Sequence, residues 1–204
     1  YAWVRDAAFS VYALHRIGLS HEAAAFLSWV LDAVERKGSP RIMYTLNGNR
    51  PPDEVNDPEL EGYRRSKPVR WGNAAADQTQ HDVYGEILDC AYQWTAHHGS
   101  MPERLWSQLC ALAEAAGREW RTPDHGIWEV RTSERPFTYS AALCQVALDR
   151  AARMAERFGL AGPRQQWRQM ADDIGRAILE EAWDAGANTL SEHLGGGGLD
   201  ASLL

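Results

Sequence analysis

The sequence contains no apolar run approaching the ~20 residues that a membrane-spanning helix needs. It also lacks an excess of positive charge: 21 Lys and Arg stand against 28 Asp and Glu, for a formal net charge of -7. Nucleic acids and anionic membranes are recognised through basic patches. We therefore expect no nucleic-acid partner and no membrane partner, and we expect the protein to be cytoplasmic.

Cysteine is scarce as well. Cys90, Cys110 and Cys144 are odd in number, widely spaced and set among apolar residues at helical spacing. This pattern predicts buried thiols rather than disulfides or a metal site. His97 and His98 precede a glycine at a helix end, where a cation complements the helix dipole, so they predict capping rather than metal binding. The sequence thus predicts neither a metal nor a cofactor.

What the sequence does contain is the helical period, in six stretches. Apolar residues recur every three or four positions in 6–17, 21–36, 83–94, 105–116, 143–154 and 167–178. Glycines at 18, 38, 99 and 159 follow four of these stretches, as C-terminal caps do. The only strand candidate is 41–46. We therefore predict an all-α fold of six helices in three pairs, forming a single domain over 1–204.

The connections between the predicted helices alternate between short and long. The long ones, 39–76 and 121–138, carry aromatic and charged residues, and long connections in compact domains are usually functional. An α/α toroid gives this pattern, because loops from one rim gather over a central pocket. We therefore expect site residues in these two connections and at the start of the first helix.

One cluster lies in the second long connection. Glu129 follows Trp128 and precedes Arg131 by two residues. A carboxylic acid beside an indole is poorly solvated, which favours its protonated form, and a general acid must hold its proton near neutral pH. Glycoside hydrolases use such a group to protonate the leaving oxygen. The alternative is a buried tryptophan beside a Glu–Arg surface pair.

Two further clusters combine aromatic rings with polar side chains, the mixture typical of sugar sites. Trp3, Arg5 and Asp6 open the chain, and the first long connection leads into a run of polar residues. Trp3, Trp71 and Trp128 are the candidate platforms for sugar rings, since the other tryptophans are expected in helices. The candidate binding residues are Trp3, Arg5, Asp6, Arg70, Trp71, Asn73, Gln80, Asp82, Trp128 and Arg131.

These three clusters, in this order, resemble glycoside hydrolase family 15, which holds glucoamylases, glucodextranases and bacterial trehalases. The resemblance runs from Tyr1 to Leu204 and implies about half of an (α/α)6 toroid. It implies an inverting α-glucoside hydrolase in which Glu129 is the general acid and the first cluster grips the terminal glucose. The implied substrate is an α-glucan oligosaccharide or trehalose.

The sequence departs from the family pattern in one respect. The family's general base is a second glutamate, far C-terminal of the acid, in a Glu-Gly-x-Phe-like context that is absent here. We therefore expect the N-terminal part of a catalytic domain, cut at both ends, inactive alone and completed by the remainder of its parent chain. Two other functions stay open: a non-catalytic carbohydrate-sensing domain on the same scaffold, and a sugar isomerase, which the lack of matched loop histidines disfavours.

Overall fold

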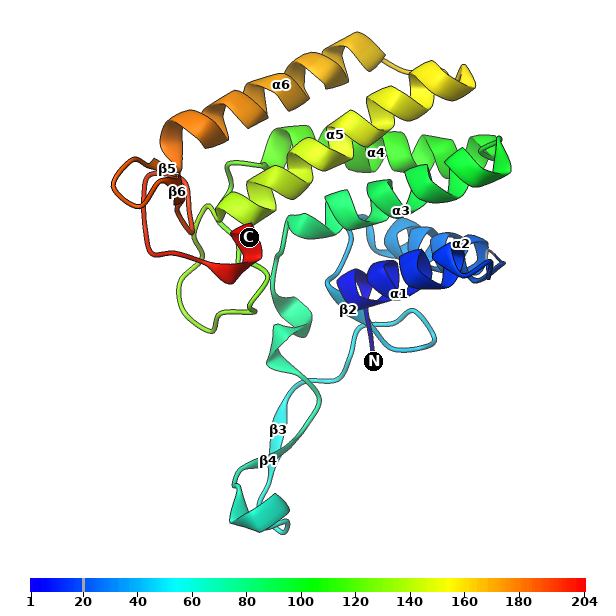
Figure 1. Ribbon diagram of the computed structural model, residues 1–204. Helices are drawn as coiled ribbons and strands as arrows, with labels where there is room; N and C mark the ends of the chain where they lie inside the picture. The colour runs from blue at the N-terminus through cyan, green and yellow to red at the C-terminus, as the bar shows by residue number, and fades with distance from the viewer. Residues whose placement is uncertain (20) are drawn as a thin grey trace.

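The computed structural model describes residues 1–19 and 21–204, and these ranges contain six α-helices. In chain order the helices are α1 (Val4–Arg16), α2 (His21–Lys37), α3 (Asp82–His98), α4 (Glu103–Glu119), α5 (Thr138–Phe158) and α6 (Arg164–Glu181). Each odd-numbered helix packs against the helix that follows it, and the two run in opposite directions (Figure 1). The predicted all-α fold of three helical hairpins is confirmed.

The hairpins stack side by side in two layers. Helices α1, α3 and α5 contact one another in that order, and α2, α4 and α6 form the second layer behind them. The N-terminal ends of α1, α3 and α5 lie at the same end of the stack, where the two long connections also gather (Figure 1). This is the arrangement expected for consecutive hairpins of an α/α toroid, and it places the three sequence clusters at one rim.

The close approach of α3 and α5 depends on a glycine. A Cβ atom built on Gly85 would lie 2.4 Å from the carbonyl oxygen of Leu143, a distance that real side chains do not reach. The buried residues of α5 include small ones such as Ala141 and Ala147. Backbones can therefore approach closely here, and any larger residue at Gly85 would push the two helices apart.

The predicted apolar stripes form most of the core, with one shift. The stripe of α4 is buried throughout, whereas in α5 the predicted Leu143 and Val146 are only half-buried, and Cys144 and Leu148 are fully buried beside them. The reason is that α5 contacts α3, α4 and α6, so its buried sector is wider than a single stripe. Trp167, from α6, is the largest fully buried side chain.

Short strands tie the connections to the helices. They pair as β1 (Ala2–Trp3) with β2 (Met43–Tyr44), β3 (Val55–Asp57) with β4 (Val69–Trp71), and β5 (Trp183–Asp184) with β6 (Thr189–Leu190), all antiparallel. The β3–β4 hairpin projects away from the helices (Figure 1). Short 3-10 turns occupy Tyr63–Arg65, Ala74–Asp77 and Ala201–Leu203.

Three local predictions need correction. The first helix begins at Val4 rather than at residue 6, because Trp3 pairs with Met43 as a strand and the chain turns helical directly after it. The strand predicted over 41–46 covers only Met43–Tyr44, since Thr45 begins a tight turn whose carbonyl accepts from the Gly48 N–H. Trp183, which the sequence predicts in a helix, lies in β5 and is half exposed.

The described residues include no helix that is both long and apolar enough to cross a bilayer. They also include no group of three or more His, Cys, Asp or Glu side chains that could hold a metal ion. All three cysteines are free: Cys90 and Cys144 are buried and Cys110 is half-buried. The prediction of buried thiols rather than disulfides is confirmed for the first two.

Candidate active site

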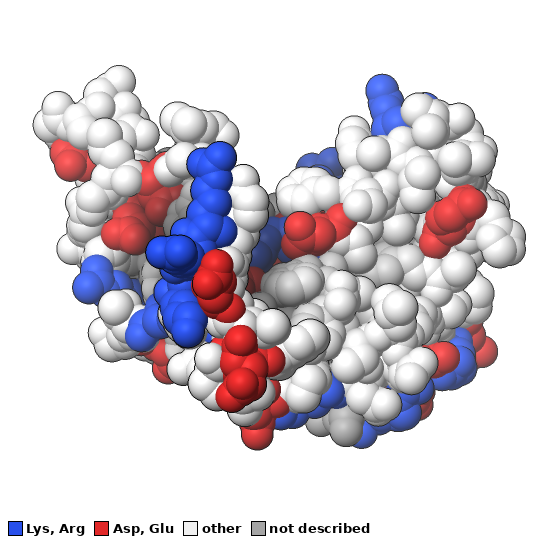
Figure 2. Space-filling view, turned by 90° about the horizontal axis from the view of Figure 1, so that it is seen from below, with Lys and Arg blue, Asp and Glu red and all other residues white. Residues whose placement is uncertain are grey.

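A cavity of about 580 Å³, open to the surface, lies where the start of α1 meets the loop 121–137. It is lined by Trp3, Arg5, Asp6, Phe9, Ile127, Trp128 and Glu129. The structure therefore brings together the first and the last of the three predicted clusters, which are far apart in the sequence. The face of the molecule seen in Figure 2 is hollowed near its middle, and acidic side chains lie within the hollow.

The candidate acid is held by a tryptophan, although by a different one from its sequence neighbour. The indole Nε1–H of Trp3 donates a hydrogen bond to Oε1 of Glu129 at 2.7 Å. The indole of Trp128 instead donates to the carboxylate of Asp200, at 3.0 and 2.9 Å from its two oxygens. Trp3 thus fixes the carboxyl group, while Trp128, 57% exposed, forms part of the cavity wall.

Glu129 has a left-handed backbone conformation, with φ +53°. For a residue with a Cβ atom this costs roughly 1–2 kcal/mol and persists only where the surroundings enforce it. The turn is closed by two backbone hydrogen bonds, from the Glu129 N–H to the Gly126 carbonyl and from the Val130 N–H to the His125 carbonyl, both 3.2 Å. Gly126 has φ +63° and lies against the Phe137 ring, so no side chain fits there.

The loop is anchored to the segment that precedes α3. The His125 N–H donates to the Thr79 carbonyl at 3.0 Å, and the His81 N–H donates to Oδ2 of Asp124 at 2.7 Å. Asp124 is fully buried, and this burial raises the pKa of its carboxyl group, although the His81 N–H opposes the shift. The loop that carries Glu129 is therefore held against residues 79–81, directly before α3.

Arg5 links α1 to that same segment. Its guanidinium donates to Oδ2 of Asp82 at 2.5 Å, to Oε1 of Gln80 at 3.2 Å and to the carbonyl of Ile127 at 3.0 Å. Burial has the largest single effect and lowers the pKa of Arg5, but the charge of Asp82, the hydrogen bond to it and the smaller effects of Tyr139 and Glu86 together raise the pKa. The three predicted residues Arg5, Gln80 and Asp82 therefore lie together, with Asp82 binding Arg5.

Asp6 is exposed and lies in the first turn of α1, where it lines the cavity with Glu129. A carboxylate in the first turn is stabilised by the helix dipole. Arg5 pairs with Asp82, and the described residues show no ion pair between Arg5 and Asp6. The carboxylate of Asp6 is left facing the cavity, where it can accept a hydrogen bond from a ligand.

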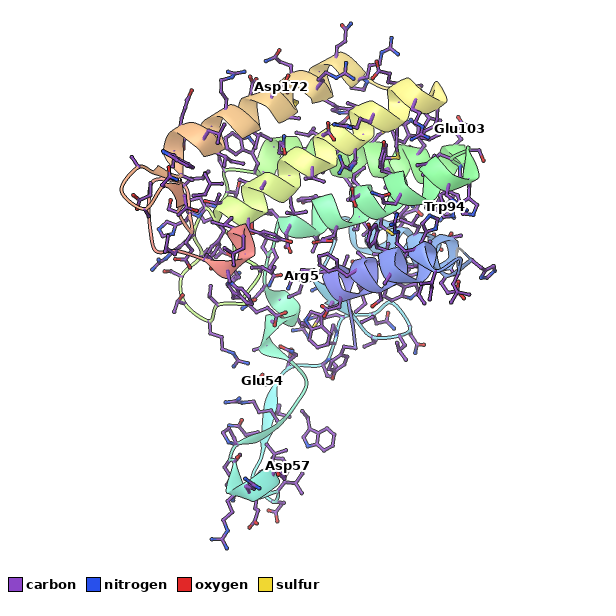
Figure 3. The ribbon with its side chains drawn as sticks, in the orientation of Figure 1. Arg5, Glu54, Asp57, Trp94, Glu103 and Asp172 are labelled. Carbon is purple, nitrogen blue, oxygen red and sulfur yellow. The ribbon has the colours of Figure 1, made fainter. Side chains whose placement is uncertain are left out.

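The remaining predicted residues lie on or next to the β3–β4 hairpin, outside the cavity lining. Arg131 donates to both oxygens of Glu54 at 2.9 Å, and Arg70 lies 3.4 Å from the same carboxylate. Trp71 donates to Asp57 near the end of the hairpin (Figure 3). For Arg70, Trp71 and Arg131, contact with a sugar stays a prediction.

Asn73 accepts a hydrogen bond from the Ala75 N–H at 2.9 Å, so it caps the 3-10 turn that follows. That turn leads into the segment holding Gln78 and Gln80. The carboxamide of Asn73 is therefore used by the backbone, and its expected role in binding sugar also stays a prediction.

A second carboxylate is buried close to Arg5. Glu86, on α3, accepts a hydrogen bond from the hydroxyl of Tyr139 at 3.3 Å. Burial, and then the charge of Asp82, raise the pKa of Glu86 to about 7. Its side chain lines a second, smaller cavity of about 270 Å³ between α1, α2 and α3, so it does not share the cavity of Glu129.

Sequence reasoning missed several contributors to this site. Phe9 and the carbonyl of Ile127 line or hold it without any motif that signals them. Gln78 was visible within the Gln-x-Gln-x-Asp pattern but was not assigned; its amide donates to the carbonyls of Glu129 and Val130 at 3.3 and 3.0 Å. Alternate residues of an extended segment share one side, which is the signal that could have identified it.

Known proteins are similar to this chain along its whole length. A model of the family described as glycosyl hydrolases family 15 matches residues 1–204. A trehalase of Mycobacterium tuberculosis is 41% identical over 208 residues, covering 100% of this chain and 30% of that protein. A trehalase of Thermoplasma volcanium is 34% identical over 209 residues, covering 100% of this chain and 33% of that protein.

Solved structures give the same fold. A glycosidase variant superposes with a TM-score of 0.73 at 22% identity, over 100% of this chain and 53% of that one. A second glycosidase variant, in complex with glucose, superposes with a TM-score of 0.68 at 21% identity, over 99% of this chain and 53% of that one. The chain thus spans about a third of the length of the curated relatives it matches and about half of the solved chains. By its match over every residue, the chain belongs to glycosyl hydrolase family 15.

Proposed function

We propose that this chain forms part of an inverting α-glucoside hydrolase in which Glu129 is the general acid. The observation that carries the proposal is the cavity that joins Glu129 to Trp3, Arg5 and Asp6. Its volume of about 580 Å³ lies within the range of roughly 300–1,000 Å³ that is usual for small-ligand sites. It combines aromatic walls with a few polar groups, as sugar sites do.

In the proposed reaction, Glu129 gives its proton to the glycosidic oxygen as the bond to the anomeric carbon breaks. A second carboxylate, supplied by the rest of the protein, deprotonates the water that attacks from the opposite face. In inverting enzymes the two carboxyl groups lie about 6.5–9.5 Å apart, which leaves room for that water. Asp6 accepts hydrogen bonds from hydroxyls of the terminal glucose, and Trp128 contacts the ring.

The substrate class we propose is α-linked glucosides, with trehalose as the first to test. Two relatives that match the whole chain, at 41% and 34% identity, are named trehalases. The α-glucan oligosaccharides remain the alternative within the same class. Residues beyond the first glucose site would decide between them, and these lie partly in the rest of the protein.

The test uses the full-length protein with trehalose, maltose and isomaltose as substrates. Glu129→Gln should lower kcat by about 100- to 10,000-fold, the usual range for general acid catalysis, with substrate binding nearly unchanged. Glu134→Gln is the matched control, because Glu134 lies exposed in the same loop, beside His125 and outside the cavity lining. Near-full activity of Glu129→Gln would remove the proposed role. Binding of a glucoside without any hydrolysis by the wild type would favour a sensing domain.

A further inference from the structure

We propose that Gln78 is a positioning residue that holds Glu129 in its left-handed turn and thereby aims the carboxyl group of the acid. This inference rests on the proposed function, because it assumes that Glu129 donates the proton. Gln78 lies outside the lining of the cavity, so it would act through the backbone of Glu129 rather than on the sugar.

The first step is the contact itself. The amide Nε2 of Gln78 donates to the carbonyl of Glu129 at 3.3 Å and to the carbonyl of Val130 at 3.0 Å. These are two successive carbonyls on the C-terminal side of the strained residue. Rotation about ψ of Glu129 would swing its carbonyl away from the amide. The side chain of Gln78 therefore opposes relaxation of the left-handed conformation, which φ +53° makes unfavourable for a residue with a Cβ atom.

The orientation of the Gln78 amide is fixed by a relay. Its Oε1 accepts from Nε2 of Gln80 at 3.3 Å, and Oε1 of Gln80 accepts from Arg5 at 3.2 Å. A guanidinium can only donate and a backbone carbonyl can only accept. Between these two ends, each amide satisfies its neighbours in one orientation alone, since a flipped amide would place two donors or two acceptors against each other.

The residues that orient the Gln78 amide, Gln80 and Arg5, are themselves held in place. Gln80 is 2% exposed, and Arg5 is bound to the fully buried Asp82. Gln78 itself sits in an extended backbone, with φ −70° and ψ 144°, which directs residues 78 and 80 to the same side. The Arg5–Asp82 ion pair therefore stabilises the turn at Glu129 through the side-chain amides of Gln80 and Gln78. These contacts are separate from the indole of Trp3, which binds the carboxyl group.

The expected effect follows from this geometry. Gln78→Met keeps the length of the side chain but removes both its donor and its acceptor. A catalytic group displaced by about 1 Å can lose a factor of 100 in rate. We expect kcat of the full-length protein on trehalose or maltose to fall by about 10- to 100-fold. KM should change by less than about threefold, because Trp3, Asp6 and Trp128 stay in place.

A second substrate separates positioning of the acid from damage to the fold. α-Glucosyl fluoride releases fluoride, which leaves without being protonated, so its hydrolysis needs no general acid. Gln78→Met should therefore hydrolyse it at a rate within about threefold of the wild type. If Gln78 only stabilised the fold, both substrates would be hydrolysed more slowly to the same extent, and the proposal would be wrong.

Two controls accompany the test. Gln169→Met makes the same chemical change on α6, where the amide of Gln169 donates to Asp173 at 2.9 Å, and it should leave both rates unchanged. Gln78→Asn keeps the amide but is one methylene shorter, so it cannot reach both carbonyls. It should reproduce the loss on glucosides, and it replaces Gln78→Met in the comparison if that variant fails to fold.

Glu129→Gln, measured in parallel, distinguishes failure of the positioning role of Gln78 from failure of the proposed function. If it loses glucoside hydrolysis and keeps fluoride hydrolysis while Gln78→Met and Gln78→Asn match the wild type on both substrates, the positioning role is overturned and the proposed function stands. If Glu129→Gln keeps full activity on glucosides, the proposed function itself fails, and with it the role of Gln78. If the variants at Gln78 and at Glu129 both lose hydrolysis of glucosides and keep hydrolysis of the fluoride, the positioning role and the proposed function are both supported.

Discussion

The indole N–H of Trp3 donates a 2.7 Å hydrogen bond to the carboxyl group of Glu129, across 126 positions in the sequence. Trp3 is itself fixed, since its backbone pairs with Met43 and the N–H of Val4 donates to the carbonyl of Ile42 at 2.9 Å. A hydrogen bond to an ionisable acid is among the stronger kinds. The contact joins the start of the chain to the candidate acid and brings the beginning of α1 to the candidate site.

Trp3→Phe tests this contact, because phenylalanine keeps the aromatic face and removes the N–H donor. In the full-length protein we expect kcat on an α-glucoside to fall by about 10- to 100-fold, since hydrogen bonds to charged groups contribute about 1.5–3 kcal/mol. Trp29→Phe is the matched control: its indole donates to the carbonyl of Leu46, away from the cavity. Equal kinetics for Trp3→Phe and the wild type would show that the contact does not serve catalysis.

Asp6→Ala tests the binding of the terminal glucose. The exposed carboxylate faces the cavity, while its neighbour Arg5 is bound to Asp82, so its removal takes away an acceptor for the sugar. We expect kcat/KM to drop by at least about tenfold, which corresponds to about 1.4 kcal/mol. Asp172→Ala on α6, an exposed aspartate far from the cavity (Figure 3), should have no effect. A similar, small change in both variants would contradict the assignment of Asp6.

Glu54→Gln tests the link between the β3–β4 hairpin and the acid loop. Hydrogen bonding from Arg131 lowers the pKa of Glu54 to about 2. A carboxyl group whose pKa is lower in the folded protein than in the unfolded chain stabilises the fold at pH values above its unfolded-state pKa. This stabilisation disappears as the pH falls from about 4.5 towards 2. The melting temperature of Glu54→Gln should therefore lie below that of the wild type near pH 7, with a difference that narrows as the pH is lowered. Because the pair is at the surface, added salt should narrow it too. A difference independent of pH and salt would contradict this reading.

Glu86→Gln tests the buried carboxylate on α3. The groups that face Glu86 are Asp82, Asp89, Arg5 and Tyr139, and burial is the main cause that raises its pKa to about 7. Between about pH 4.5 and 7 the unfolded chain loses this proton while the folded protein keeps it, so stability falls as the pH rises. The melting temperature of Glu86→Gln should rise relative to the wild type over that interval. A constant difference between the two proteins from pH 4 to 8 would show that Glu86 does not titrate as described.

The sequence predicted the fold well because its evidence is local. Apolar residues at helical spacing and glycine caps define helices without reference to the rest of the chain, so the six helices in three pairs were predictable. The start of α1 was missed by two residues, because it depends on Trp3 pairing with Met43, a contact made about forty residues away. The breadth of the buried face of α5 likewise depends on which helices surround it.

The candidate site was predictable only in part. Residue types and their order in the chain pointed to Trp3, Asp6 and Glu129, which line one cavity. The partner of each polar group was not predictable, since it depends on the path of the loops: Asp82 holds Arg5, and Glu54 holds Arg131. Glu129 lies in a left-handed turn, and the side chains on either side of this turn point in different directions. The indole of the adjacent Trp128 therefore donates to Asp200 rather than to Glu129.

The anomeric form of the first products is the most direct test of inverting hydrolysis of an α-glucoside. The full-length protein would be mixed with trehalose and the products followed by proton NMR before mutarotation. Cleavage with inversion gives one β-glucose from the attacked ring and one α-glucose from the leaving ring, so we expect equal initial amounts of the two. The initial formation of α-glucose alone would mean retention, and it would contradict the claim.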